Sequence, residues 1–384
     1  MKITGVTALP VTFGHARESL SYCFVRVDSD DGAPGYGEAC DSFGCTYARV
    51  VERVVEDALA PLLVGEDVTD VEYLTARLRG WTRRRLGDQW IVMHAISAVE
   101  IALFDVAAKA RGVTIGGLVG RVRDRVPVYA SSVFLEEGDA DWHCALLEPL
   151  LTRGVRAVKL RLGPDYRRDL ETLAALRALL DDDVDLMIDG NENFTLPTAL
   201  TIAARLADLG VLWFEEPLPQ HHRSAIAELN RRAPLAIAYG EHLFGLHDFA
   251  DCLQRGEASV IQPDAATAGG IAETRRIAQL AHGAGARVVP HCAAGPIALA
   301  ANLHVAASVP AVQLLEYPFP LADAWEAFGE GAQLGPEHLE DGMLPVPAAP
   351  GLGVELVGGE TLARYPYVPP GPRDGVPTRS VGDR

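Results

Sequence analysis

The sequence predicts an α/β protein in which a TIM-type barrel follows a small α+β capping domain. After Arg125, eight short apolar runs alternate with amphipathic segments at a fairly even period, which is typical of buried parallel strands joined by helical crossovers. Before Arg125, strand-like runs are followed by helical patterns instead. The chain has 384 residues, which is long enough for a barrel of about 250 residues and a smaller domain.

The first 125 residues contain the pattern of a hairpin followed by three helices. Strand-like runs over residues 3–13 and 22–27 flank a polar segment, which predicts a hairpin. Apolar residues recur at helical spacing over residues 46–63, and a long helix over residues 91–111 would end at Gly112. Between them, Thr69 and Glu72 have the spacing of a capping box, in which each side chain satisfies a free backbone amide.

The remaining residues divide into a barrel over 126–320 and a C-terminal segment over 321–384. Crossover helices are expected over 168–180 and 271–284, and the segment from Tyr365 is rich in Pro and Gly, typical of a loose tail. The predicted barrel strands are the apolar runs at 126–131, 157–160, 186–188, 212–214, 236–238, 260–261, 288–289 and 312–315.

Composition excludes several classes of protein. The formal charge is −18, so a phosphate backbone or an anionic membrane would be repelled. With 48% hydrophobic residues, the chain can bury a sizeable core. The apolar stretch from Cys292 to Val309 is interrupted by Gly, Pro, Asn and His, whereas a membrane span needs about 18 uninterrupted apolar residues. The N-terminus has no export-signal pattern and the six cysteines are scattered, so we expect a soluble cytoplasmic protein.

Polar residues follow nearly every predicted barrel strand, where the active sites of such barrels lie. Three acids, Asp189, Glu215 and Glu241, come at intervals of 26 residues (215 − 189 and 241 − 215), about one strand–helix unit each. Any one of them alone would be read as a helix cap or a surface charge. Together, the three acids direct oxygen donors to one point, which is the kind of ligand set that Mg²⁺ prefers. Without a cation, the three carboxylates would repel one another.

Asp264 and His291 end neighbouring strands and are predicted to form a hydrogen-bonded dyad. A carboxylate on one ring nitrogen fixes the tautomer and raises the basicity of the other nitrogen, as a general base requires. By contrast, His221 and His222 follow Pro219 in a loop, and we expect them to face solvent.

Lys159 and Arg161 are two residues apart on one strand, so both side chains should face the barrel mouth. Paired cations beside a metal suggest a carboxylate substrate, which Arg161 could bind through two parallel hydrogen bonds. Because guanidinium keeps its proton, Lys159 is the better candidate for a base on this side.

Taken together, these motifs resemble those of the enolase superfamily and, within it, the mandelate racemase subgroup. The resemblance covers nearly the whole chain, beginning with the cap-domain helix around residues 95–105. The matching strand-end motifs are Val158-Lys159-Leu160-Arg161, Ile188-Asp189-Gly190-Asn191, Trp213-Phe214-Glu215-Glu216-Pro217, Gly240-Glu241, Gln262-Pro263-Asp264, Pro290-His291 and Glu316-Tyr317.

The resemblance implies a modified (β/α)7β barrel and Mg²⁺-assisted removal of the proton α to a carboxylate, giving an enediolate. It implies that Glu216 is not the metal ligand of its pair, and that Glu316 shares a hydrogen bond with the substrate carboxylate as a neutral acid. Asn191 and His15 would contact substrate, and cap loops at residues 15–18 and near Phe43 and Tyr47 would close over it. A homo-oligomer, dimer or octamer, is also implied.

One departure from the family pattern bears on the reaction. The racemases of this family carry Lys where this chain has Arg161, and racemisation needs an acid and a base on opposite faces of the substrate. Dehydration of an acid sugar, with His291 as the base, is therefore the first expectation. The alternatives are a racemase, epimerase or cycloisomerase in which Lys159 partners His291, and a catalytically idle scaffold, which would have lost part of this site.

Overall fold

The computed structural model describes residues 1–14, 19–30, 32–41, 43–331 and 333–370. An antiparallel sheet in the order β1-β2-β3 opens the chain, with strands β1 (Ile3–Gly14), β2 (Ser19–Ser29) and β3 (Gly35–Ala39). The predicted hairpin is therefore confirmed. Its tip at residues 15–18, which includes His15, lies outside the described residues, as does the tail over 371–384.

Helices cover this sheet much as the sequence predicts. The first helical segment consists of α1 (Ala48–Arg53), a π-helical turn (Val54–Leu59) and α2 (Ala60–Leu63), and α3 (Val71–Thr82) follows. The capping box before α3 was wrong. The N-cap residue is Asp70 and not Thr69, and the Thr69 amide, from which Glu72 would accept in a capping box, donates to Asp67 at 3.0 Å instead.

Helix α4 (Ile91–Ala110) is the central helix of the N-terminal domain. It packs directly against β3, where Gly37 is required because a β-carbon there would overlap the Ala98 carbonyl. By length and composition α4 could cross a membrane, but 94% of its apolar window is buried inside the protein. Helix α4 is therefore a core helix of the N-terminal domain. The short helix α5 (Ile115–Val119) leads to the barrel.

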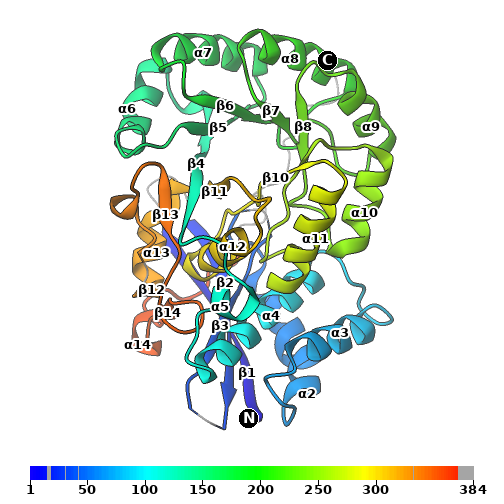
Figure 1. Cartoon of the computed structure of the whole chain (residues 1–384), viewed down its shortest axis with the longest axis vertical. Coiled ribbons are helices and arrows are strands. Elements are labelled where there is room, and N and C mark those ends of the chain that lie inside the picture. The colour runs from blue at the N-terminus through cyan, green and yellow to red at the C-terminus, as the bar shows by residue number, and fades with distance from the viewer. Residues whose placement is uncertain (15–18, 31, 42, 332, 371–384) are drawn as a thin grey trace.

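The barrel contains all eight predicted strands in parallel (Figure 1). Neighbouring strands follow the order β10-β9-β8-β7-β6-β5-β4-β11, and β11 pairs with β4. A bridge between Val288 and Val312, just before β11, joins the two ends of the sheet. The strands are β4 (Arg125–Phe134), β5 (Ala157–Arg161), β6 (Asp185–Asp189), β7 (Trp213–Glu215), β8 (Ala236–Tyr239), β9 (Val260–Ile261), β10 (Arg287–Val288) and β11 (Leu315–Tyr317).

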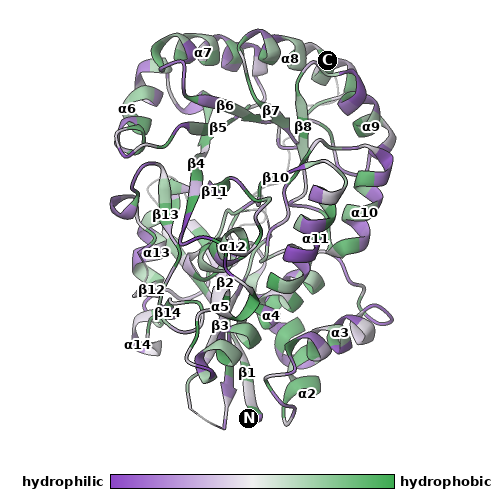
Figure 2. Ribbon diagram, in the orientation of Figure 1, coloured by the Kyte–Doolittle hydropathy of each residue, from purple (hydrophilic) through white to green (hydrophobic). Residues whose placement is uncertain are grey.

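Crossover helices lie around the outside of the strands (Figure 1). Figure 2 shows both hydrophobic and hydrophilic residues on these outer helices, as expected when one face packs on the sheet and the other meets water. The exception is the last helix, α12, of which every residue is buried. The helices are α6 (Ala140–Leu151), α7 (Tyr166–Leu179), α8 (Leu196–Asp208), α9 (Arg223–Arg232), α10 (Gly245–Arg255), α11 (Ile271–Gly283) and α12 (Pro296–Ser308).

The C-terminal segment contacts both parts of the molecule. Strand β13 (Met343–Pro345) pairs with β4 of the barrel, while the Phe328 ring at the end of α13 (Ala322–Phe328) lies within 5.6 Å of the rings of Phe13, Tyr22 and Phe24 in the N-terminal sheet. The other strands and α-helix of this segment are β12 (Gly329–Glu330), β14 (Glu355–Leu356) and α14 (Gly359–Leu362). Packing of one segment on both domains fixes the N-terminal domain over the barrel.

Candidate active site

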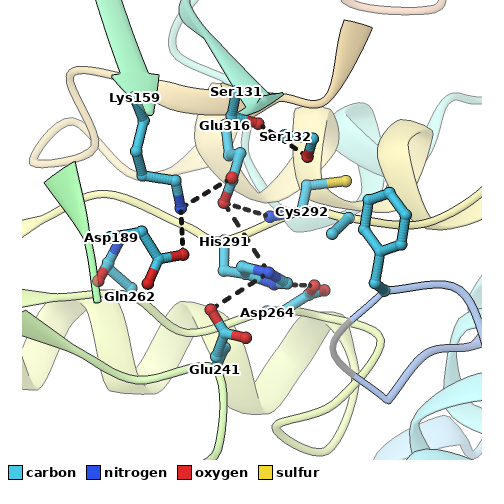
Figure 3. A network of polar contacts seen from close by, with 12 residues as sticks. Ser131, Ser132, Lys159, Asp189, Glu241, Gln262, Asp264, His291, Cys292 and Glu316 are labelled. Atoms are coloured by element: carbon cyan, nitrogen blue, oxygen red, sulfur yellow. Dashed lines mark hydrogen bonds and ion pairs between the residues drawn. The ribbon is translucent and has the colours of Figure 1, made fainter. Parts of the chain in front are cut away.

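The barrel brings the predicted strand-end residues together at its mouth (Figure 3). Each of them is less than 10% exposed, although all carry charged or polar groups. Charged groups are buried only when they pair with one another or bind a ligand, so the mouth is the natural place to look for chemistry. The residues are Lys159, Arg161, Asp189, Glu215, Glu241, Asp264, His291 and Glu316.

Lys159 lies at the centre of the cluster. Its Nζ forms an ion pair with Glu215, lies 2.8 Å from Glu316 Oε1 and is 4.0 Å from Asp189 Oδ2. Burial works to lower the pKa of Lys159, but the charges of these acids outweigh burial and raise it. Lys159 is therefore a buried ammonium with carboxylates on several sides.

Arg161 points to the same mouth, with its Nε 3.4 Å from Asp189 Oδ2. Its guanidinium carbon lies 5.7 Å from the ring centres of both Phe134, at the end of β4, and Phe43 of the cap loop. Two aromatic faces hold a guanidinium in place through cation–π attraction. The predicted cap loop thus reaches the site through Phe43, whereas Tyr47 is 52% exposed.

The three predicted metal ligands are buried acids from adjacent strands. Burial raises the pKa of Asp189, and it raises the pKa of Glu215 to about 8, with charge repulsion from the other acids adding to the effect on both. Glu215 Oε2 also accepts hydrogen bonds from Gln262 Nε2 at 2.6 Å and Trp213 Nε1 at 3.2 Å. Such a desolvated all-oxygen donor set fits a hard divalent cation.

Glu241 differs from the other two acids. Burial works to raise its pKa, but His291 and His242 outweigh burial and lower the pKa. Among the described residues, the three potential ligands whose donor atoms lie within 4.8 Å of one another are Glu192, Glu216 and His242. The predicted trio does not form such a group, and two of its members, Asp189 and Glu215, lie beside the Lys159 ammonium.

His291 and Asp264 lie in contact. The His291 Nδ1 is 2.9 Å from Asp264 Oδ2, while the other Asp264 oxygen accepts from Asn302 Nδ2 and the Ala266 amide. His291 Nε2 is buried without a hydrogen-bond partner among the described residues, with Glu241 Oε2 at 3.4 Å. Burial works to lower the pKa of His291, but Glu241, Glu316 and Asp264 raise it to about 10.

Glu316 lies between Lys159 and His291, and its Oε2 also accepts from the Cys292 amide at 3.3 Å. Burial works to raise its pKa, yet Lys159 and His291 lower it to about 2. Glu316 is therefore ionised in this structure. This speaks against the neutral acid expected from the sequence, because two cations lie beside the carboxylate.

The rim of the mouth contains a pair of side chains to which the sequence assigned no task. Glu216 was named there only as the acid that does not bind the metal, and His242 was missed. They directly follow the predicted ligands Glu215 and Glu241, and His242 Nδ1 lies 3.0 Å from Glu216 Oε1. The sequence signal that could have identified the pair is a second polar residue directly after each predicted ligand at a strand end. His221 and His222 are exposed, as predicted, while Asn191 bonds through its Nδ2 to Asp189 Oδ2 at 3.2 Å.

Comparison with known proteins agrees with this architecture. Residues 5–120 match the family model for the mandelate racemase / muconate lactonizing enzyme N-terminal domain, and residues 144–360 match the enolase C-terminal domain-like model. The chain is 30% identical to the D-galactarolactone cycloisomerase of Agrobacterium fabrum, over 88% of this chain and 89% of that protein. It is also 30% identical to the arabinonate dehydratase of Saccharolobus solfataricus, over 90% and 91%.

Solved structures agree as well. The 3,6-anhydro-D-galactonate cycloisomerase from Zobellia galactanivorans superposes with a TM-score of 0.83 at 27% identity, covering 95% of this chain and 99% of that one. A member of the enolase superfamily from Polaromonas sp. JS666 gives a TM-score of 0.85 at 28% identity, covering 96% and 99%.

Proposed function

Because the chain belongs to the mandelate racemase subgroup of the enolase superfamily, we propose that it removes the proton α to the carboxylate of an acid sugar. The observation that carries this proposal is His291. One ring nitrogen is bound to Asp264, and the other is buried without a hydrogen bond among the acids of the mouth. An imidazole oriented by a carboxylate is suited to proton transfer. A cation held by Glu241 would offset the negative charge that raises the pKa of His291, and so would free the second nitrogen to accept a proton.

Asp189, Glu215 and Glu241 would hold Mg²⁺. When bound, the ion supplies positive charge that stabilises the negative charge developing on the substrate carboxylate. The ammonium of Lys159 and the guanidinium of Arg161, both buried at the mouth, would bind and orient that carboxylate. A small anionic substrate therefore fits the cations that the chain itself provides.

His291 Nε2 would take the α proton, and the electron pair of the broken C–H bond would pass into the carboxylate to give an enediolate. Those electrons then return as the bond between the β carbon and its hydroxyl breaks. The proton on His291 Nε2 goes to the departing hydroxyl, which leaves as water. The resulting enol tautomerises to a 2-keto-3-deoxy acid, so atoms and charge balance without another reactant.

Dehydration is favoured over racemisation because this chain has Arg161 where the racemases of this family carry Lys, and a guanidinium does not accept a proton. Lys159, the other cation on that side, has the task of binding the substrate carboxylate in this proposal. A cycloisomerase is the second candidate, since the chain is as similar to the Agrobacterium fabrum cycloisomerase as to the arabinonate dehydratase. Both reactions begin with removal of an α proton by a single base.

A screen of mono- and di-acid sugars and their lactones with Mg²⁺ tests the proposal. We expect 2-keto acid, measured by semicarbazide absorbance, from at least one hexonate, pentonate or aldarate, and none after EDTA treatment. The same incubations in D₂O, followed by NMR, separate the alternatives. Isomerisation or deuterium uptake without keto acid would move the assignment to a cycloisomerase or racemase, and undiminished turnover after metal removal would contradict the proposal.

A further inference from the structure

Glu241 is flanked by two imidazoles rather than one. His291 Nε2 lies 3.4 Å from Glu241 Oε2, and His242 Nε2 lies 3.8 Å from Glu241 Oε1. Each ring turns its Nε2 toward a different oxygen of the same carboxylate. Each oxygen of the Glu241 carboxylate therefore has an imidazole beside it.

The two imidazoles are also held in the same way. His291 Nδ1 is bound to Asp264 at 2.9 Å, and His242 Nδ1 lies 3.0 and 3.1 Å from the two oxygens of Glu216. Both acids are at most 2% exposed. A carboxylate on Nδ1 fixes the orientation of the ring and determines which nitrogen faces the centre.

The second pair, Glu216 and His242, is held in place by further residues at the rim of the mouth. The Gln220 side-chain amide donates to the His242 carbonyl, and the Trp90 ring centre lies 5.4 Å from that of His242. Glu216 has a backbone φ of +36°, a conformation that L-residues seldom adopt. That turn follows directly on Glu215, so two successive glutamates serve different partners: Glu215 bonds Lys159, and Glu216 bonds His242.

We propose that Glu216 and His242 are positioning residues that hold Glu241 in the orientation needed to bind the metal. This rests on the proposed function, in which Glu241 is a ligand. His291 faces the substrate side and transfers the proton, whereas His242, at the rim next to Trp90, acts only through Glu241. The two similar pairs thus have different tasks, one in proton transfer and one in metal affinity.

Mn²⁺ titration of the purified protein, followed by electron paramagnetic resonance without substrate, tests the assignment. His242→Phe keeps a ring against Trp90 but removes both nitrogens, and we expect the Mn²⁺ dissociation constant to rise about tenfold. Glu216→Gln keeps an oxygen for Nδ1, so its effect should be smaller. Because Glu216 acts through His242, adding Glu216→Gln to His242→Phe should have little further effect.

His221→Gln is the matched control, because it changes an exposed histidine of the neighbouring loop and should leave the dissociation constant within about twofold. Circular dichroism establishes folding, and His242→Gln replaces His242→Phe if the latter does not fold. Unchanged Mn²⁺ affinity in folded Glu216 and His242 variants would overturn the positioning role alone. Loss of a second Mn²⁺ equivalent would make His242 a ligand instead, and a wild type that binds no Mn²⁺ would defeat the proposed function as well.

Discussion

Two groups of buried acids in this molecule have opposite surroundings. At the barrel mouth, the acids lie beside cationic or imidazole side chains, as Glu316 does with Lys159, even where they also accept from a backbone amide. Between the domains, Glu38 and Glu100 of the N-terminal domain accept hydrogen bonds from backbone amides at the starts of barrel helices. Glu100 binds the amides of Ile271 and Ala272 at 2.7 and 2.9 Å, and Glu38 binds those of Gly295 and Ala298 at 2.6 and 3.0 Å.

This difference separates acids that hold the fold from acids available for chemistry. A carboxylate at a helix N-terminus satisfies free amides and complements the helix dipole, and the main chain fixes its partners. Side-chain cations at the mouth can exchange one partner for another when a ligand arrives. Burial alone therefore does not mark a functional acid, whereas the kind of partner does.

Replacing an interdomain acid should affect stability and not the site. Glu100→Gln offers one carbonyl oxygen where two amides need an acceptor, so one buried amide loses its bond. We expect the free energy of unfolding to fall by about 1–3 kcal/mol in urea titrations, with Mn²⁺ affinity unchanged. The exposed Glu171→Gln is the control, expected within about 0.5 kcal/mol of wild type. Altered metal affinity in folded Glu100→Gln would break the distinction between the two groups of acids.

Two buried histidines, one at the mouth and one outside it, also differ in their surroundings, and their pKa values shift in opposite directions. His304 Nδ1 accepts from the Gly116 amide at 3.2 Å, and its Nε2 lies 3.0 Å from the Leu352 carbonyl, so the neutral ring satisfies both. Burial lowers the pKa of His304 to about 4, whereas the acids around His291 raise the pKa of that ring to about 10.

Between pH 6.5 and about 4, the unfolded state binds a proton at His304 that the folded state does not. Stability contributed by this residue is therefore present above pH 6.5 and is lost as pH falls, with a slope of up to about 1.4 kcal/mol per pH unit. Comparing the pH dependence of unfolding in wild type and His304→Gln measures this contribution. An identical slope in the two proteins would contradict the assignment.

Much of the fold could be predicted from the sequence because parallel strands and their helices each leave a local pattern. The hairpin and all eight barrel strands were located, although the last predicted strand, 312–315, overlaps β11 only at Leu315. The strand-end rule also identified Asp264 and His291 as neighbours. The predicted capping box before α3 is wrong because Asp70 is the N-cap residue and the Thr69 amide donates to Asp67.

What the sequence could not predict depends on contacts between distant segments. Phe43 meets Arg161 only because the cap loop docks on the barrel, where the Gly44 amide donates to the Ala293 carbonyl at 2.8 Å. The pairing of Glu216 with His242 likewise depends on the backbone turn at Glu216, which no periodicity reveals. Local sequence patterns predict helices, strands and the residues at strand ends. Which side chains contact one another across the mouth can be seen only in the assembled fold.

His291 is the base on which the whole proposed reaction depends. His291→Asn keeps a polar side chain beside Asp264 but cannot accept the α proton. With the acid sugar identified by the screen, we predict that turnover falls by about 10²–10⁴-fold while the Mn²⁺ dissociation constant stays within about twofold. Turnover that survives the substitution, or parallel loss of metal binding, would contradict the assignment of proton transfer to this residue.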